Sequence, residues 1–215
     1  MSRSIPLEII DDQEDGRSQR RDAIANRKLI LRTAEKLFAE RGVHEVNMAD
    51  IAQAAGVGKG TLYRRFTNKA ALCLALMDAQ MREFQNTMLE RMRTMSANGV
   101  SRLEQLMHFL DALVHFTDAH VPLLCEIQRE GMVTQDETSL QLPHFWQYMT
   151  VNGLLRAARE AGEIAPDLDV DYLADALLAP LKADIFRYQR EVRGFSLERI
   201  SQGLQTLVSG LRVCV

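Results

Sequence analysis

Apolar residues recur three and four positions apart along most of the chain, which is the spacing of an amphipathic α-helix. The sequence contains no internal repeat and no sustained alternation of the kind that marks a β-strand. This pattern and its breaks predict about nine helices, over approximately 22–41, 48–55, 59–66, 69–97, 102–119, 122–131, 141–161, 170–193 and 197–213. The predicted fold class is therefore all-α.

Capping residues and prolines set several of these boundaries. Asn47 is a good N-cap for the second helix, and Ser101 with Glu104 forms a capping box for the fifth. Pro122 suits the first turn of a new helix, so the fifth helix is predicted to end before it. Pro180 is predicted to kink the eighth helix.

Charge is distributed unevenly along a chain whose net charge is −3. Residues 1–16 carry a net charge of −4, residues 17–70 carry +7, and residues 71–215 carry −6. A basic block inside an acidic chain indicates a local contact with a polyanion. The low overall charge is therefore no argument against nucleic-acid binding.

The three cysteines lie far apart and form no CxxC pair, which argues against a disulfide framework or a structural zinc site. The N-terminus lacks the apolar core of a secretory signal, and the longest uncharged stretch, Thr138–Leu155, is too polar for a membrane span. We expect a soluble, cytoplasmic protein without a metal or other cofactor.

The predicted helices around residues 48–66 form a helix-turn-helix, because a glycine-containing turn separates two short helices. At 100° per residue, Leu62 and Phe66 fall on the core side of the second helix, whereas Thr61 and Arg64 fall opposite. Gly60 leaves room for close approach of a partner, and an arginine can contact a guanine edge through two hydrogen bonds.

The exposed face therefore suits the major groove of DNA. The predicted DNA-binding residues are Asn47, Lys59, Gly60, Thr61, Tyr63, Arg64, Arg65 and Lys69. The plainer alternative is a solvated helix face with ordinary surface cations, and for Arg65 alone the two interpretations are about equal.

Three motifs make a family resemblance specific. They are A-x-x-LF-x-x-x-G over residues 34–42, IA-x-x-AGV over 51–57 and G-TLY-x-x-F-x-x-K-x-x-L over 60–72. This segment resembles the DNA-binding head of the TetR family of transcriptional regulators. It departs from the family pattern at Asn47, where Thr or Ser is commoner, and at Gly58, which is often Ser or Thr.

The resemblance implies a helical body after the head, which binds a small molecule and dimerises. We therefore expect a disordered tail over residues 1–21, a DNA-binding domain over 22–68, and a ligand-binding and dimerisation domain over 69–215. Candidate ligand-binding residues are Phe84, Met88, Met92, Phe109, Leu113, Phe116, Leu124, Phe145 and Met149. For any one of them, filling the core of the bundle is the commoner role of such a side chain.

His108, Asp111, His115 and Asp118 share one face of the fifth predicted helix and could form half of a metal site. No cysteine and no second histidine pair accompanies them, so we interpret this stripe as a solvated helix face.

The predicted function is a homodimeric, sequence-specific repressor that a small hydrophobic or amphipathic ligand releases from operator DNA. The last two helices are expected to form the dimer, through stripes that include Leu173, Leu177, Leu181, Leu204, Leu207 and Leu211. The helix that begins at Lys69 would couple the ligand to the head. One alternative is a DNA-organising protein without an effector. Another is a helical enzyme, but no catalytic motif supports it and we do not expect an enzyme.

Overall fold

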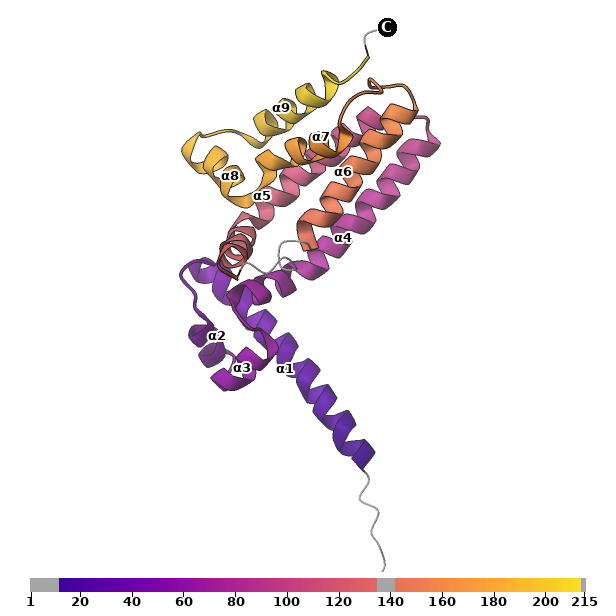
Figure 1. Cartoon of the computed structure of the whole chain (residues 1–215). Coiled ribbons are helices and arrows are strands. Elements are labelled where there is room, and N and C mark those ends of the chain that lie inside the picture. The colour runs from indigo at the N-terminus through magenta and orange to yellow at the C-terminus, as the bar shows by residue number, and fades with distance from the viewer. Residues whose placement is uncertain (1–11, 135–141, 214–215) are drawn as a thin grey trace, which may run out of the picture. The chain divides into compact units, whose positions relative to one another are not determined.

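The computed structural model describes residues 12–134 and 142–213 (Figure 1). The chain divides into two compact units, Met1–Asn68 and Lys69–Val215, which we call the head and the body. This division falls between the same two residues as the predicted domain boundary. The DNA-binding and ligand-binding roles of the two parts stay predictions.

The head consists of three helices around a small apolar core. These are α1 (Asp12–Arg41), α2 (Met48–Ala54) and α3 (Lys59–Arg65). The core side of α1 presents Ile30, Ala34 and Phe38 at four-residue spacing, and their exposed fractions are 0%, 0% and 8%. Ile51 of α2 and Leu62 of α3 are both fully buried, which fixes the inner face of each short helix.

Helix α1 begins at Asp12, ten residues before the predicted start, so the expectation of a disordered tail over 1–21 is wrong for residues 12–21. The segment DQEDGRSQRR contains no proline and no β-branched residue, and its acids precede its arginines. That order complements the helix dipole, so the helix continues through this segment despite Gly16. Residues 1–11 lie outside the described part of the chain.

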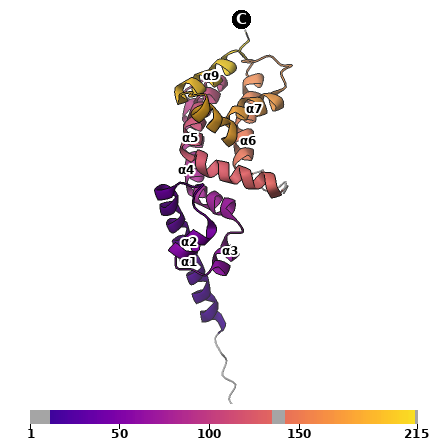
Figure 2. The same cartoon turned by 90° about the vertical axis from the view of Figure 1, so that its left-hand side faces the viewer.

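The body is a helical bundle built around α5 (Figure 2). Its helices are α4 (Lys69–Ala97), α5 (Arg102–Thr134), α6 (Leu142–Glu160), α7 (Val170–Leu178), α8 (Ala183–Arg187) and α9 (Leu197–Ser209). Helix α5 packs against α4, α6, α8 and α9, and its Leu106, Phe109, Leu110 and Leu113 are fully buried. Residues 12–134 and 142–213 contain nine α-helices and no strand, so the all-α prediction is confirmed. None of these helices is long and apolar enough to cross a membrane.

Helix α5 continues through Pro122, so the prediction of two separate helices here is wrong. A proline inside a helix removes one hydrogen bond and costs about 3 kcal/mol. Buried side chains lie on both sides of the proline, including Val114, Val121 and Glu126. Their burial favours one continuous helix over a break.

The predicted eighth helix is interrupted rather than kinked. Pro180 lies in a 3-10 turn, Ala179–Leu181, after which Lys182 is extended at φ −61° and ψ 138°. The chain then forms α8 and a π-helical turn, Tyr188–Val192. Proline cannot donate to the carbonyl four residues earlier, which explains why α7 ends where it does.

Candidate DNA interface and candidate ligand site

A well-formed turn joins α2 to α3. Gly56 adopts φ 65°, and its amide donates to the carbonyl of Gln53 at 3.1 Å. The Val57 amide donates to the carbonyl of Ala52 at 3.0 Å. This pair of hydrogen bonds is a Schellman motif, which favours glycine at its left-handed position. The predicted glycine-containing turn between the two short helices is confirmed.

Asn47 caps α2 through a reciprocal pair of hydrogen bonds. The Asp50 amide donates to Asn47 Oδ1, and the Asn47 amide donates to Asp50 Oδ2, both at 3.0 Å. Asp50 also lies 3.6 Å from the Arg41 guanidinium at the end of α1. The predicted N-cap is confirmed, and Asp50 adds a capping box and an ion pair that connect α2 to α1.

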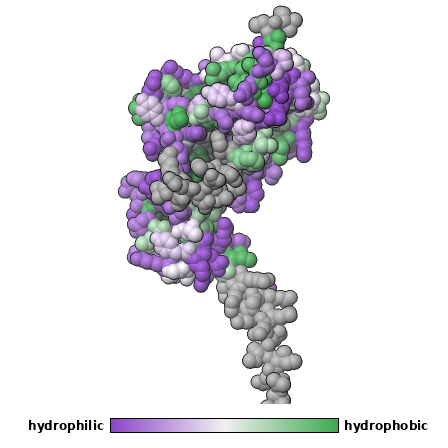
Figure 3. All heavy atoms as spheres, viewed as in Figure 1, coloured by the Kyte–Doolittle hydropathy of each residue, from purple (hydrophilic) through white to green (hydrophobic). Residues whose placement is uncertain are grey.

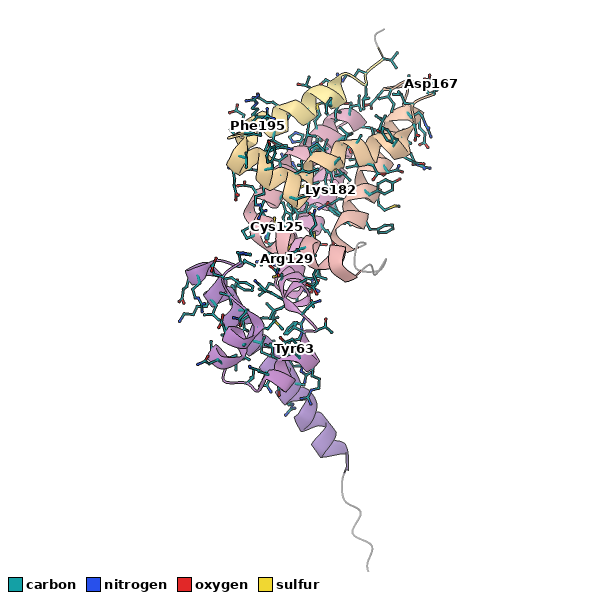
Figure 4. All side chains as sticks on the ribbon, turned by 60° about the vertical axis from the view of Figure 1, so that its left-hand side comes forward. Tyr63, Cys125, Arg129, Asp167, Lys182 and Phe195 are labelled. Carbon is teal, nitrogen blue, oxygen red and sulfur yellow. The ribbon has the colours of Figure 1, made fainter. Side chains whose placement is uncertain are left out.

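Helix α3 presents two chemically different faces. Leu62 and Phe66 are 0% and 3% exposed, as the helical phase predicted. The outer face carries the cations Lys59, Arg64 and Arg65, all exposed, together with Tyr63, which is 50% exposed and labelled in Figure 4. Thr61 is half-buried between the two faces. Six of the predicted DNA-binding residues, with Gly60 among them, therefore lie on one short helix.

The head itself does not require a glycine at position 60. A β-carbon added to Gly60 would meet no atom within 4 Å, and the residue is not in the left-handed region. Glycine inside a helix costs about 1 kcal/mol relative to alanine. A glycine here is therefore understandable if a partner's backbone must come close to α3.

Lys69 differs from the other predicted DNA-binding residues because it begins α4, in the body. Its side chain is only 13% exposed, and its Nζ lies 3.5 Å from the carboxylate of Glu126, which is 5% exposed. Arg129, labelled in Figure 4, donates to the same carboxylate at 2.6 Å. The Lys69 ammonium thus has an intramolecular acidic partner that the sequence did not reveal.

Aromatic side chains from three helices gather in the body. Phe84 of α4 stacks on Phe116 of α5 with ring centroids 4.5 Å apart. Trp146 of α6 lies 6.0 Å from Phe84 and 5.5 Å from Phe109, edge-on to both rings. His120 stacks on Phe116 at 4.3 Å and thereby extends the cluster. We call these five residues the aromatic cluster.

The aromatic cluster contains three of the nine predicted ligand-binding residues. The other six differ in how far their side chains are buried. Met88 and Leu113 are buried in the adjoining core, Met92 packs against it, and Leu124 is half-buried. Phe145 and Met149 are 60% and 52% exposed, so they line no enclosed space in this structure.

Trp146 was absent from the predicted ligand-binding set. Trp146 meets Phe84 and Phe109 from another helix, and residue spacing along one helix does not reveal contacts between helices. The stronger signal was that Trp146 is the single tryptophan of a chain poor in aromatic residues.

The stripe of His108, Asp111, His115 and Asp118 is only partly solvated. His108 and His115 are exposed, but the Ser201 hydroxyl donates to Asp111 at 2.5 Å. Arg190 Nε donates to Asp118 at 2.8 Å. The two carboxylates thus hold the C-terminal helices against α5, which corrects the prediction of a plain solvated face.

A capped short helix, a tight turn and a second short helix with a basic outer face define a helix-turn-helix regulator of transcription. Residues 30–76 match the family model of bacterial regulatory proteins of the tetR family. The chain is also similar to the HTH-type transcriptional regulator SAR2658 of Staphylococcus aureus, with 30% identity over 83% of this chain and 90% of the relative. The chain belongs to the TetR family.

Solved structures share the fold over both units. A TetR-family repressor from Thermus thermophilus, FadR in complex with lauroyl-CoA, has a TM-score of 0.64 at 24% identity and covers 88% of this chain and 96% of its own. A transcriptional regulator from Saccharomonospora viridis in complex with choline has a TM-score of 0.65 at 21% identity, covering 88% and 98%. Both likenesses concern the fold.

Proposed function

We propose that this protein is a homodimeric repressor that binds operator DNA through α3 in the cytoplasm and is released by an amphipathic small molecule. The observation that carries the proposal is the outer face of α3, where exposed cations surround a glycine that the head does not need. Arg64 suits a guanine edge, whereas Lys59 and Tyr63 suit phosphate oxygens.

Two such helices would read two half-sites in a symmetric operator. A dimer that places them in successive major grooves needs a separation of about 34–36 Å. Two local features support this role. The Schellman turn sets the direction of α3 relative to α2. The Asn47 capping box and the Asp50–Arg41 ion pair fix the start of α2 at the end of α1. A recognition helix that is held rigidly favours sequence-specific binding over non-specific electrostatic binding.

We assign the dimer contact to the C-terminal helices, but to other residues than the leucines predicted from the sequence. Leu177, Leu181 and Leu204 are 4%, 8% and 3% exposed and belong to the protomer's own core, so they cannot form the contact. Exposed apolar residues occur on the same part of the chain instead: Tyr172, Ile185, Tyr188, Val192 and Leu207 are between 40% and 70% exposed. Figure 3 shows hydrophobic surface near the C-terminal end of α9.

The effector site is assigned to the aromatic cluster. Its rings come from α4, α5 and α6, so a ligand that enters between them would change how these helices pack. The Thermus relative binds lauroyl-CoA and the Saccharomonospora relative binds choline, which supports a ligand with an apolar part and a polar part. Aromatic rings suit both an apolar chain and an ammonium head group.

Helix α4 is the proposed connection from this cluster to the head. Phe84 lies fifteen residues after Lys69, or about 22 Å along the helix axis. A ligand releases DNA only if it prefers the conformation that does not bind DNA. A hundredfold release requires about 2.7 kcal/mol of differential affinity.

The proposal is tested by measuring operator affinity with and without lauroyl-CoA and choline as probes, while Trp146 fluorescence reports binding. We expect one probe to shift the fluorescence and weaken operator binding. Crowding the cluster from the adjoining core by Met88→Trp should weaken operator binding without unfolding the chain. A variant that binds operator like wild type and still responds to the probe would place the effector site elsewhere.

A further inference from the structure

Helix α1 has two halves with different roles. From Ile30 onward it supplies buried residues to the head core, but no described side chain between Arg21 and Leu29 is buried. Figures 1 and 2 both show the first half continuing past α2 and α3. Helices in proteins draw most of their stability from tertiary packing, so the first half has little to stabilise it within the head itself.

This unpacked half is strongly basic. Residues 17–29 contain five arginines and lysines and a single acid, Asp22, and Arg32 lies in the helical turn that follows. Arg21 and Lys28 are seven residues apart and Arg32 follows four residues later, so all three lie on one side of the helix. Each of the three is exposed. We call Arg21, Lys28 and Arg32 the α1 basic face.

A contact within the head brings this segment beside the proposed recognition helix. The Arg27 guanidinium lies over the ring of Phe66, 5.5 Å from its centroid. Phe66 is the C-terminal cap of α3. Helix α1 therefore passes the end of α3 at Arg27, and Arg21 lies about 9 Å further along the helix axis.

We propose that the α1 basic face is a second DNA-contacting surface, which binds the phosphate backbone of duplex just outside each half-site. The inference rests on the proposed operator binding by α3. Its support is the complementary charge of phosphate and the position of α1 next to the end of α3. Such contacts add affinity and position the protein on the duplex, but they carry no base specificity.

The test compares two operator duplexes, one that ends at the outer edges of the half-sites and one extended by about ten base pairs on each side. The variant is Arg21→Gln with Lys28→Gln, since glutamine preserves helix propensity. The matched control is Arg91→Gln with Arg93→Gln, which removes two exposed cations from α4. Circular dichroism melting establishes that each variant is folded.

Wild type and the control should bind the extended duplex more tightly than the short one. The α1 variant should lose that advantage, and its salt dependence on the extended duplex should fall by about 1.8 per protomer, or 0.9 for each lost phosphate contact. Equal affinities and salt slopes for variant and wild type on the extended duplex, with Arg64→Ala still relaxing sequence preference, would overturn this inference alone. Failure of wild type to bind any duplex would instead overturn the proposed function.

Discussion

The Lys69 ammonium lies 3.5 Å from the carboxylate of Glu126, and both side chains are largely removed from water. This pair joins the first turn of α4 to α5, at the point where the body begins. The carboxylate also accepts a hydrogen bond from Arg129, so one buried acid faces two cations. The predicted contact of Lys69 with DNA would therefore have to compete with this acid.

Glu126→Gln should destabilise the body by about 3 kcal/mol, because it leaves buried positive charge without its carboxylate. Urea unfolding measures the change. The control is Asp78→Asn, which breaks an exposed pair with Arg82 on α4 whose side chains are 55% and 66% exposed. That change should cost less than about 1 kcal/mol. Equal effects of the two variants would mean that burial does not strengthen the Glu126 pair.

Gly60→Ala should separate stability from DNA binding. The added methyl meets no protein atom within 4 Å, and alanine is the better helix former, so the free energy of unfolding should rise by about 1 kcal/mol. Operator affinity should fall, because the methyl occupies the space into which DNA comes. Thermal unfolding and a duplex titration on the same preparation measure both effects. A stabilised variant with undiminished operator affinity would show that nothing approaches α3 at this position.

Much of the head could be predicted because its signals are local. The cap at Asn47, the turn at Gly56 and the inner face of α3 at Leu62 each depend on residues that are close together in the sequence. The ends of α5 and α7 could not be predicted equally well. A proline's effect depends on how much tertiary burial opposes it: α5 continues through Pro122, whereas α7 ends before Pro180.

In the candidate sites too, features set by neighbouring residues could be predicted, whereas contacts between distant residues could not. The basic face of α3 follows from helical phase, but the Lys69 pair joins residues 57 positions apart in the sequence. Leucine spacing likewise identifies an apolar helix face, but it does not show whether that face packs within the protomer or against a second subunit. Leu177 and Leu204 proved to be core residues of the protomer.

Cys73 is predicted to make the folded chain less stable at alkaline pH. Burial, reinforced by the nearby Glu126 carboxylate, raises the pKa of the Cys73 thiol from 9.0 to about 12. The unfolded chain therefore releases this proton at a lower pH than the folded chain, and the thiol's contribution to stability is lost as the pH rises from 9 towards 12.

From pH 8 to pH 10, wild type should lose about 1.4 kcal/mol more unfolding free energy than Cys73→Ala. Urea titrations of both proteins at the two pH values give this difference. Cys125→Ala is the matched control, because its half-buried thiol has a smaller upward pKa shift from burial. Parallel pH profiles for wild type and Cys73→Ala would show that the Cys73 thiol ionises as readily in the folded chain as in the unfolded one.

Dimerisation should depend on the exposed stripe of α8 and the turn that follows it. Ile185, Tyr188 and Val192 are 40%, 51% and 68% exposed and recur at helical spacing. Ile185→Glu with Val192→Glu should convert a dimer into monomers in sedimentation at micromolar concentration. Leu89→Glu, at a 49% exposed leucine of α4, should leave the dimer intact. A monomeric wild type would contradict the proposed assembly altogether.

The central claim is that the outer face of α3 reads DNA sequence, and selection of duplexes from a randomised pool tests it most directly. Wild type should enrich a symmetric site whose half-sites are centred about 34–36 Å apart. Arg64→Ala should relax preference at one base position per half-site, at a cost of about 1–3 kcal/mol. No enrichment by wild type, or the same enriched site with Arg64→Ala, would contradict the account.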